Sequence, residues 1–247
     1  MLEILEIRKD WIVAVKPFGV LSEDPSPSAR PDPVPASGKT GGGEKERGMP
    51  SLIRQALTEQ DAAFEDVYPV HRLDRTTEGL TVYALTKKGA AALSGAVARG
   101  ETEKIYAAYL TPSTDLPSSG EMRDFLFFDR KRDKAFILDP EKAEGRRGAK
   151  EAALRYELTD RFEWRGREVA RARVELMTGR THQIRAQFGA RRSPLIGDGK
   201  YGSRVNYKGP SLFAVELAFP WDGGDVRFRI ERGLREEEKP EAKAEPL

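Results

Sequence analysis

The chain is organised around residues 68–80, with the sequence Tyr68-Pro69-Val70-His71-Arg72-Leu73-Asp74-Arg75-Thr76-Thr77-Glu78-Gly79-Leu80. This stretch places one carboxylate, Asp74, between Arg72 and Arg75, and a strand-like apolar run follows it from Leu80 to Leu85. Nearby positive charge lowers the pKa of a carboxyl group, so we expect Asp74 to be ionised. An ionised carboxylate is a candidate nucleophile rather than a candidate proton donor. The alternative is a structural ion pair beside a turn.

A second basic motif lies far along the chain, at residues 178–188, Thr178-Gly179-Arg180-Thr181-His182-Gln183-Ile184-Arg185-Ala186-Gln187-Phe188. It follows a predicted strand, and its pattern predicts a helix that Thr181 caps and whose apolar side includes Ile184 and Phe188. Arg185 lies one turn into this helix, where it can point back toward a ligand at the helix start. The alternative is an amphipathic helix with a solvated arginine.

Composition indicates a soluble globular protein. The 247 residues are 38% hydrophobic and 33% charged, and 42 basic residues nearly balance 40 acidic ones. The distribution of charge is less even, because nine bases and only two acids lie between Arg171 and Lys208. Such a basic field suits a polyanion such as nucleic acid, and a solvated cationic face is the alternative.

Several classes of site are excluded by residue content. The chain has no cysteine, which removes disulfides, thiolate metal sites and cysteine nucleophiles and fits a reducing compartment. It has two histidines, His71 and His182, which are too few for a typical zinc site, so we expect no metal. Residues 1–10 resemble no signal or transit peptide, and no apolar run is long enough to span a membrane. We therefore expect a cytoplasmic protein without a membrane partner.

Hydrophobic patterning predicts an α+β fold, a mixed and mostly antiparallel sheet with a few flanking helices. Helices are predicted at residues 51–59, capped by Ser51, and at residues 86–99, ended by Gly100. Along the strand predicted at 105–110, alternate residues face opposite sides of the sheet. Further strands are predicted at residues 11–16, 122–128, 134–138, 152–158, 169–177, 212–219 and 226–230.

The pattern does not divide cleanly, so we expect one domain over residues 1–232. Within it, residues 22–50 are rich in proline and glycine and predict a long loop or flexible insertion. This segment contains Ser37-Gly38-Lys39-Thr40, which imitates the end of a phosphate-binding loop, but Pro33 stands where that loop needs a glycine. Residues 233–247 form a charged tail that we expect to be disordered.

These stretches together resemble the RluA-type pseudouridine synthases, a family that isomerises uridine within RNA. The family signature His-Arg-Leu-Asp, two variable residues, Thr, Ser, Gly is similar to residues 71–79, with Glu78 in place of the serine. We expect Glu78 to face a neighbouring base or solvent, away from Asp74. Nothing in the sequence resembles the S4 RNA-binding module that precedes the catalytic domain in many relatives. Residues 15–19, 104–108, 179–185 and 197–202 also match family motifs, and all the motifs occur along the chain in the order expected for the family.

The resemblance implies a catalytic domain with a central cleft and an isomerase that turns the uridine out of the RNA stack. The reaction breaks the bond from ribose C1′ to the base nitrogen and rejoins C1′ to C5 of the same uracil. Glycosidases need two carboxylates, but uracil leaves as a stabilised anion, so Asp74 alone suffices, either attacking C1′ or removing a ribose proton. The resemblance pairs Arg185 with Asp74, and gives Tyr106 a ring for the flipped base and a hydroxyl that accepts the C5 proton.

For RNA binding, the resemblance implies that Arg72 fills the space left in the RNA stack and that His71 supports the loop. The other RNA-binding candidates from the matched motifs are Lys104, Arg180, His182 and Gln183. The expected partner is structured ribosomal or transfer RNA, with no cofactor, and the expected state is a monomer. Two alternatives stay open. One is a catalytically silent RNA-binding protein on the same scaffold, and the other is a nucleoside or glycoside hydrolase, for which no second catalytic acid is found.

Overall fold

Eleven strands form one sheet in the computed structural model, which describes residues 2–25 and 47–234 of the chain. The strand order is β1-β2-β4-β10-β5-β9-β8-β6-β7, with β11 paired to β10 and β3 to β4. Every pair is antiparallel except β10 with β4, so the predicted mixed, mostly antiparallel sheet is confirmed. The strands are β1 (Ile4–Ile7), β2 (Trp11–Lys16), β3 (Tyr68–Pro69), β4 (Glu78–Ala84), β5 (Glu103–Leu110), β6 (Ser119–Asp129), β7 (Lys134–Leu138), β8 (Ala149–Trp164), β9 (Arg167–Leu176), β10 (Leu212–Trp221) and β11 (Gly224–Arg229).

Most predicted strands lie where the hydrophobic pattern placed them, but their lengths differ. The bounds of β2 and β7 match the predictions, whereas β1 was not predicted at all. The largest difference is β8, which has 16 residues and continues through the polar stretch after Leu158. That stretch pairs with β9 in a long hairpin, so backbone hydrogen bonding to β9 extends the strand where the side chains give no apolar signal.

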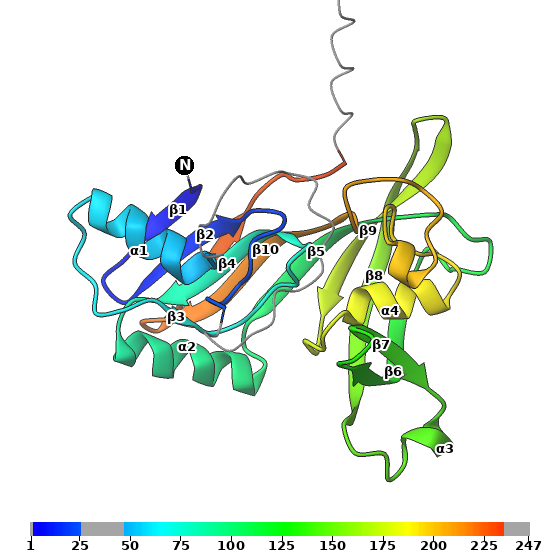
Figure 1. Cartoon of the computed structure of the whole chain (residues 1–247), viewed down its shortest axis with the longest axis horizontal. Helices are drawn as coiled ribbons and strands as arrows, with labels where there is room; N and C mark the ends of the chain where they lie inside the picture. Colours follow the sequence, from blue (N-terminus) through cyan, green and yellow to red (C-terminus); the bar gives the residue numbers. More distant parts are fainter. Residues whose placement is uncertain (1, 26–46, 235–247) are drawn as a thin grey trace, which may run out of the picture.

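One half of the sheet is covered on both faces by helices, α1 (Met49–Glu59) and α2 (Lys87–Arg99), as Figure 1 shows. Ile12 and Ala14 of β2 pack with α1, while the alternate residues Trp11 and Val13 pack with Leu93 of α2. The period of two along a strand therefore divides β2 between two core clusters. The helix α2 follows the prediction, with the Thr86 side chain accepting a hydrogen bond from the Gly89 amide and Gly100 in the left-handed conformation.

The start of α1 differs from the prediction. The helix begins at Met49 rather than at Ser51, with Pro50 in its first turn, where proline is tolerated. The Asp24 carboxylate accepts hydrogen bonds from the backbone amides of Gly48 and Ser51, so a residue distant in sequence takes the capping role. Of the insertion predicted at 22–50, residues 49 and 50 belong to α1, whereas residues 22–25 and 47–48 lie in no helix or strand. Its residues 26–46, with the phosphate-loop imitation at 37–40, lie outside the described residues, as do residues 235–247 of the predicted tail.

The other half of the sheet carries α4 (Gln183–Ala190) on one face, with the short η1 (Gly199–Tyr201) beside it, while α3 (Pro140–Ala143) lies apart from α4, in the connection from β7 to β8 (Figure 1). Tyr106, Ala108 and Leu110 of β5 pack in the same core cluster as Ile184 and Phe188 of α4. The alternate β5 residues Ile105, Ala107 and Tyr109 belong to a cluster on the opposite face, which confirms the predicted alternation. Among the described residues, no helix has the length and apolar character needed to cross a membrane.

Candidate active site

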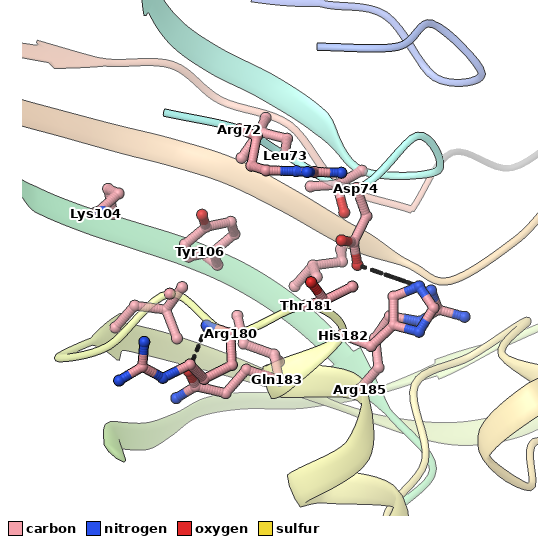
Figure 2. Close-up of a pocket in the computed structure, with 15 residues that line it drawn as sticks. Arg72, Leu73, Asp74, Lys104, Tyr106, Arg180, Thr181, His182, Gln183 and Arg185 are labelled. Atoms are coloured by element: carbon pink, nitrogen blue, oxygen red, sulfur yellow. Dashed lines mark hydrogen bonds and ion pairs between the residues drawn. The ribbon is translucent and has the colours of Figure 1, made fainter. Parts of the chain in front are cut away.

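A pocket opens where the loop before β4 meets β5 and the start of α4, and we call it the Asp74 pocket. Figure 2 shows Asp74 directed toward His182 and Arg185, with Tyr106 on β5 to one side. The pocket collects residues from both halves of the sheet, because the 72–77 loop precedes β4 and the 179–185 segment follows β9. Its lining residues are Arg72, Leu73, Asp74, Thr77, Lys104, Tyr106, Leu176, Gly179, Arg180, Thr181, His182, Gln183, Ile184, Arg185 and Leu212.

The Asp74 loop is fixed by buried polar contacts on both sides of the aspartate. The Ser22 hydroxyl accepts a hydrogen bond from the Leu73 amide and donates one to the Leu73 carbonyl, both at 2.9 Å. The Thr77 amide donates to the Asp74 carbonyl at 2.9 Å and closes a turn. The backbone around Asp74 is therefore held by groups other than its own side chain, which leaves the carboxylate available to the pocket.

Lys16 is the second anchor of this loop. Its side chain is fully buried, and its ammonium group donates to three backbone carbonyls, those of Pro17, Val20 and Arg75, at 2.8 to 3.0 Å. Burial lowers the pKa of Lys16 to about 7, although the charge of Asp74 opposes this shift. The lysine of residues 15–19 thus ties the end of β2 to the residue that follows Asp74.

Arg185 lies between two aspartates. It donates two hydrogen bonds to Asp198, from Nε to Oδ2 at 2.7 Å and from Nη2 to Oδ1 at 2.9 Å. Its Nη1 is 3.8 Å from Oδ2 of Asp74, which is within ion-pair range but too long for a hydrogen bond. Arg185 therefore lies within ion-pair distance of Asp74, as expected, but its hydrogen bonds go to Asp198, a partner that was not predicted. Burial lowers the pKa of Arg185, but the hydrogen bonds and charge of Asp198 outweigh it, so the net shift is upward.

Asp198 and Tyr201 are the residues whose importance the sequence did not reveal. Both lie in the glycine-rich segment at 197–202, which matched a family motif without suggesting a role. Asp198 is 1% exposed, and such a buried acid needs a cationic partner. A usable signal existed, because Asp198 is one of only two acids in the basic stretch from Arg171 to Lys208.

His182 connects Asp74 to Tyr201. The Tyr201 hydroxyl accepts a hydrogen bond from the Ala135 amide at 2.7 Å and lies 3.0 Å from Nδ1 of His182. Burial is the main reason that the pKa of His182 is lowered, so its ring is neutral at neutral pH. Tyr201 then donates its one proton to Nδ1, which places the histidine proton on Nε2. That nitrogen faces Oδ2 of Asp74 at 3.9 Å.

The helix α4 does not begin as predicted. Thr181 does not cap it, since His182 is the residue before the helix, in the left-handed conformation with φ of 57°. The side chain of Gln183 instead accepts hydrogen bonds from the Arg180 amide and the Thr178 hydroxyl. Gln183 is therefore 2% exposed and organises the turn, although it also lines the pocket.

Tyr106 and Lys104 extend from β5 into the Asp74 pocket. Tyr106 is 5% exposed, and burial and the charge of Asp74 raise the pKa of its hydroxyl. Burial lowers the pKa of Lys104. These two residues are two positions apart, so the alternation of the strand directs both side chains to the same face.

Two other predicted residues have different surroundings. Arg72 is exposed at the edge of the pocket. His71 does not line the pocket, and its Nε2 accepts a hydrogen bond from the Val82 amide of β4 at 3.1 Å. Burial, with a smaller effect of Lys104, lowers the pKa of His71 to about 3. The geometry agrees with His71 as a support of the loop.

The basic stretch from Arg171 to Lys208 is not one surface. Ala170 and Ala172 of β9 pack on the α4 face, so Arg171 and Arg173 extend from the opposite face of the sheet. Arg185 is buried against Asp198, and Arg191 pairs with Asp124. The basic field that the sequence suggested is therefore not continuous, because the fold distributes these charges over both faces of the sheet and the interior.

Glu78 has the surroundings that were expected. Its carboxylate lies 3.7 Å from Nζ of Lys208 and 3.3 Å from Nε of Arg232. The negative charge that replaces the usual serine is thus compensated by two cations and does not line the Asp74 pocket.

The described residues contain no group of three histidine or acidic side chains that could hold a metal ion. The pocket combines a partly exposed carboxylate with a neutral histidine, a tyrosine, and several cations at its edge. Such an arrangement can bind an anionic substrate and present one carboxylate to it.

Comparison with known proteins gives a consistent result. The family model for RNA pseudouridylate synthase matches residues 10–190. Ribosomal large subunit pseudouridine synthase D of Xylella fastidiosa is 28% identical over 233 residues, which are 93% of this chain and 62% of that protein. An uncharacterized RNA pseudouridine synthase of Haemophilus influenzae is 30% identical over 184 residues, 72% of each chain. RNA pseudouridine synthase 2, chloroplastic, of Oryza sativa is 35% identical over 156 residues, 60% of this chain and 34% of that protein.

The chain spans less than two thirds of the length of the rice and Xylella proteins. Among solved structures, Human RNA Pseudouridylate Synthase Domain Containing 4 is similar with a TM-score of 0.69 and 18% identity, covering 93% of this chain and 88% of that chain. This structural likeness confirms the fold class inferred from the sequence.

Proposed function

Because the chain belongs to the RNA pseudouridylate synthase family, we propose that it isomerises uridine to pseudouridine in an RNA, with Asp74 acting on the sugar. The observation that carries this proposal is the position of Asp74. Its carboxylate lines a pocket, is 21% exposed, and lies 3.8 Å and 3.9 Å from Arg185 and His182 without a hydrogen bond to either. A carboxylate beside cationic and polar groups, yet not fully engaged by them, suits attack on an electrophilic carbon.

In this mechanism the target nucleotide leaves the RNA stack and its uracil enters the Asp74 pocket. Asp74 assists cleavage of the bond between C1′ and N1, the uracil turns, and C1′ bonds to C5. The proton on C5 is lost and N1 gains one, so the reaction is an isomerisation. Arg185 and His182 hold the carboxylate in place. Arg72, exposed at the pocket edge, can enter the space that the nucleotide leaves.

Tyr106 is proposed to lie against the uracil and to move the C5 proton. Since its pKa is raised, its hydroxyl is protonated at neutral pH and is a weak base. The Tyr106 hydroxyl therefore accepts the C5 proton only while it gives up its own proton. The candidate acceptors of the tyrosine proton are the carboxylate of Asp74 and N1 of the uracil, which no longer bonds to C1′.

Ribosomal RNA is the substrate class we propose, because the Xylella relative is named for the large ribosomal subunit. The catalytically silent alternative gains no support from Glu78, whose charge is paired with Lys208 and Arg232. A hydrolase would need a second acid, and Asp74 is the only acidic residue that lines the Asp74 pocket in the described part of the chain.

The test is to map pseudouridines across total RNA from cells with and without the gene. A uridine that is modified only when the gene is present identifies the target. Complementation with Asp74→Asn is expected to abolish the modification while the purified variant still binds the target RNA. Modification by Asp74→Asn at the native level would contradict the role of Asp74.

A further inference from the structure

A second hollow lies beside the Asp74 pocket, between the β6–β7 hairpin and the loop before α4, and we call it the hairpin pocket. Its lining residues are Leu126, Phe127, Phe128, Arg130, Ala135, Gly148, Lys150, Gly179, Arg180 and Thr181. The two pockets share Gly179, Arg180 and Thr181. One loop therefore forms the wall between them, and a chain molecule that occupies the first can continue into the second.

Every charged residue that lines the hairpin pocket is basic. Arg130 and Lys150 are exposed, and neither makes an ion pair with any residue that the structure describes. Arg180 is also exposed and donates from Nε only to the carbonyl of Glu151. Three cations thus converge on one hollow without an anion to balance them, which favours an anionic ligand.

The cations of another groove differ in this respect. The large groove on the opposite face of the sheet contains Arg173 and Arg229, and both lie within ion-pair distance of Glu216. Arg171 of the same groove pairs with Asp160. That groove offers no comparable excess of unpaired charge, so the hairpin pocket is the better candidate for a polyanion.

An aromatic ring lies beside these cations. Leu126 and Phe128 are two residues apart on β6, and both belong to the side of the hairpin that packs toward α4. Phe128 is half-buried, with its ring edge-to-face against His182 at a centroid distance of 5.5 Å. His182 lines the Asp74 pocket and faces Asp74. The contact between Phe128 and His182 therefore connects the hairpin pocket to the Asp74 pocket. An aromatic ring beside cations suits a nucleotide, because the base stacks on the ring and the phosphate meets the charges.

We propose that the hairpin pocket binds a nucleotide that flanks the target uridine in the RNA. Its phosphate lies against Arg130, Lys150 and Arg180, and its base lies against Phe128. This inference rests on the proposed function, because it requires RNA in the Asp74 pocket. It adds residues of the β6–β7 hairpin and of β8, which no family motif identified, to the RNA-binding surface.

The test uses an oligoribonucleotide centred on the uridine that the mapping experiment identifies. In the double variant Arg130→Ala/Lys150→Ala, the plot of log Kd against log salt is expected to be less steep by up to about 0.7, because the neutralisation of one phosphate on a single strand is lost. Raising salt from about 50 to about 200 mM should therefore weaken the native protein up to about 2.6-fold more than the variant.

The matched control is Lys88→Ala/Arg167→Ala, which removes the same charge from exposed positions on α2 and at the start of β9. It should keep the native salt dependence. An RNA with neutral methylphosphonate linkages beside the target should bind the native protein more weakly than ordinary RNA does, and this difference should be smaller in the double variant, in which only Arg180 of the three cations remains. Phe128→Leu should weaken binding about tenfold, with a melting temperature that shows the fold is retained.

Equal salt dependence in the double variant and the control would overturn the inference, as would a loss of turnover without a loss of binding. These outcomes are separate from failure of the proposed function. If the native protein forms no pseudouridine in any RNA, the proposed function fails. If it forms pseudouridine normally and the salt slopes are equal, only the hairpin pocket is refuted.

Discussion

Two aspartates flank Arg185, and their surroundings are opposite. Asp198 is 1% exposed and accepts two hydrogen bonds from the guanidinium group. Asp74 is 21% exposed and remains 3.8 Å from the same group. A carboxylate that is buried and fully hydrogen-bonded is a structural partner, whereas one held nearby without hydrogen bonds keeps its oxygens for a ligand. The comparison indicates that Asp198 positions Arg185, and that Arg185 then positions Asp74.

The largest expected difference between the two aspartates is in stability. Asp198→Asn leaves the charge of Arg185 buried without its partner, so the free energy of unfolding should fall by about 3–5 kcal/mol. Asp74→Asn should change it by less than about 1 kcal/mol, since its ion pairs are long and partly exposed. Urea unfolding of both variants measures this. If Asp74→Asn is as destabilising as Asp198→Asn, the distinction between a structural Asp198 and an available Asp74 is contradicted.

The next largest effect is expected at Tyr106, which lines the same pocket as Asp74. Tyr106→Phe keeps the ring and removes the hydroxyl, so turnover should fall about 100-fold if that hydroxyl moves the C5 proton. RNA affinity should be unchanged because the ring remains. Single-turnover kinetics with the mapped RNA and a separate binding titration distinguish the two effects. A variant with native turnover would assign Tyr106 to packing alone.

A smaller effect concerns His71, which lies close to Asp74 in sequence but outside its pocket. Its pKa is about 3 in the folded protein, against an ordinary value of 6.5, so the unfolded chain binds the proton more readily between these values. The free energy of unfolding should therefore fall as pH drops below 6.5, by up to about 1.4 kcal/mol per pH unit from this residue. His71→Gln can still accept the hydrogen bond from Val82 and should flatten that dependence. Urea unfolding at several pH values from neutral to acidic measures it, and an unchanged slope would contradict the assignment.

The smallest expected effect is at Glu78, the third acid of this region. Its ion pairs with Lys208 and Arg232 are 3.7 Å and 3.3 Å long, so Glu78→Ser should cost less than about 1 kcal/mol of stability. Pseudouridine formation should be unaffected, since the charge lies outside the Asp74 pocket. A large gain in turnover on substitution would mean that Glu78 does oppose Asp74.

Much of the fold was predictable because its signals are local. Alternating apolar residues located most strands, and Thr86 and Gly100 marked the two ends of α2. The predictions failed where a distant residue decides the local structure. Asp24 moves the start of α1 to Met49, and pairing with β9 extends β8 through polar residues.

The candidate site shows the same division. The family resemblance implied that Asp74, Tyr106 and Arg185 act at one site, and all three line the same pocket. It did not identify Asp198 as the main partner of Arg185, because the charge pattern of a sequence does not tell which acid folding brings to a given arginine. The spatial distribution of the charges from Arg171 to Lys208 could not be predicted for a related reason. The alternation of β9 and the burial of α4 separate these charges in the folded protein.

The buried ammonium group of Lys16 has a chemical consequence. Burial lowers the pKa of this amine to about 7, so it loses its proton and becomes nucleophilic more readily than an ordinary lysine, yet the same burial shields it from reagents in solution. Acylation of Lys16 therefore requires that the contacts to Pro17, Val20 and Arg75 first open. The rate at which an acylating reagent labels this lysine would report how often the segment next to Asp74 opens, and bound RNA should slow that labelling.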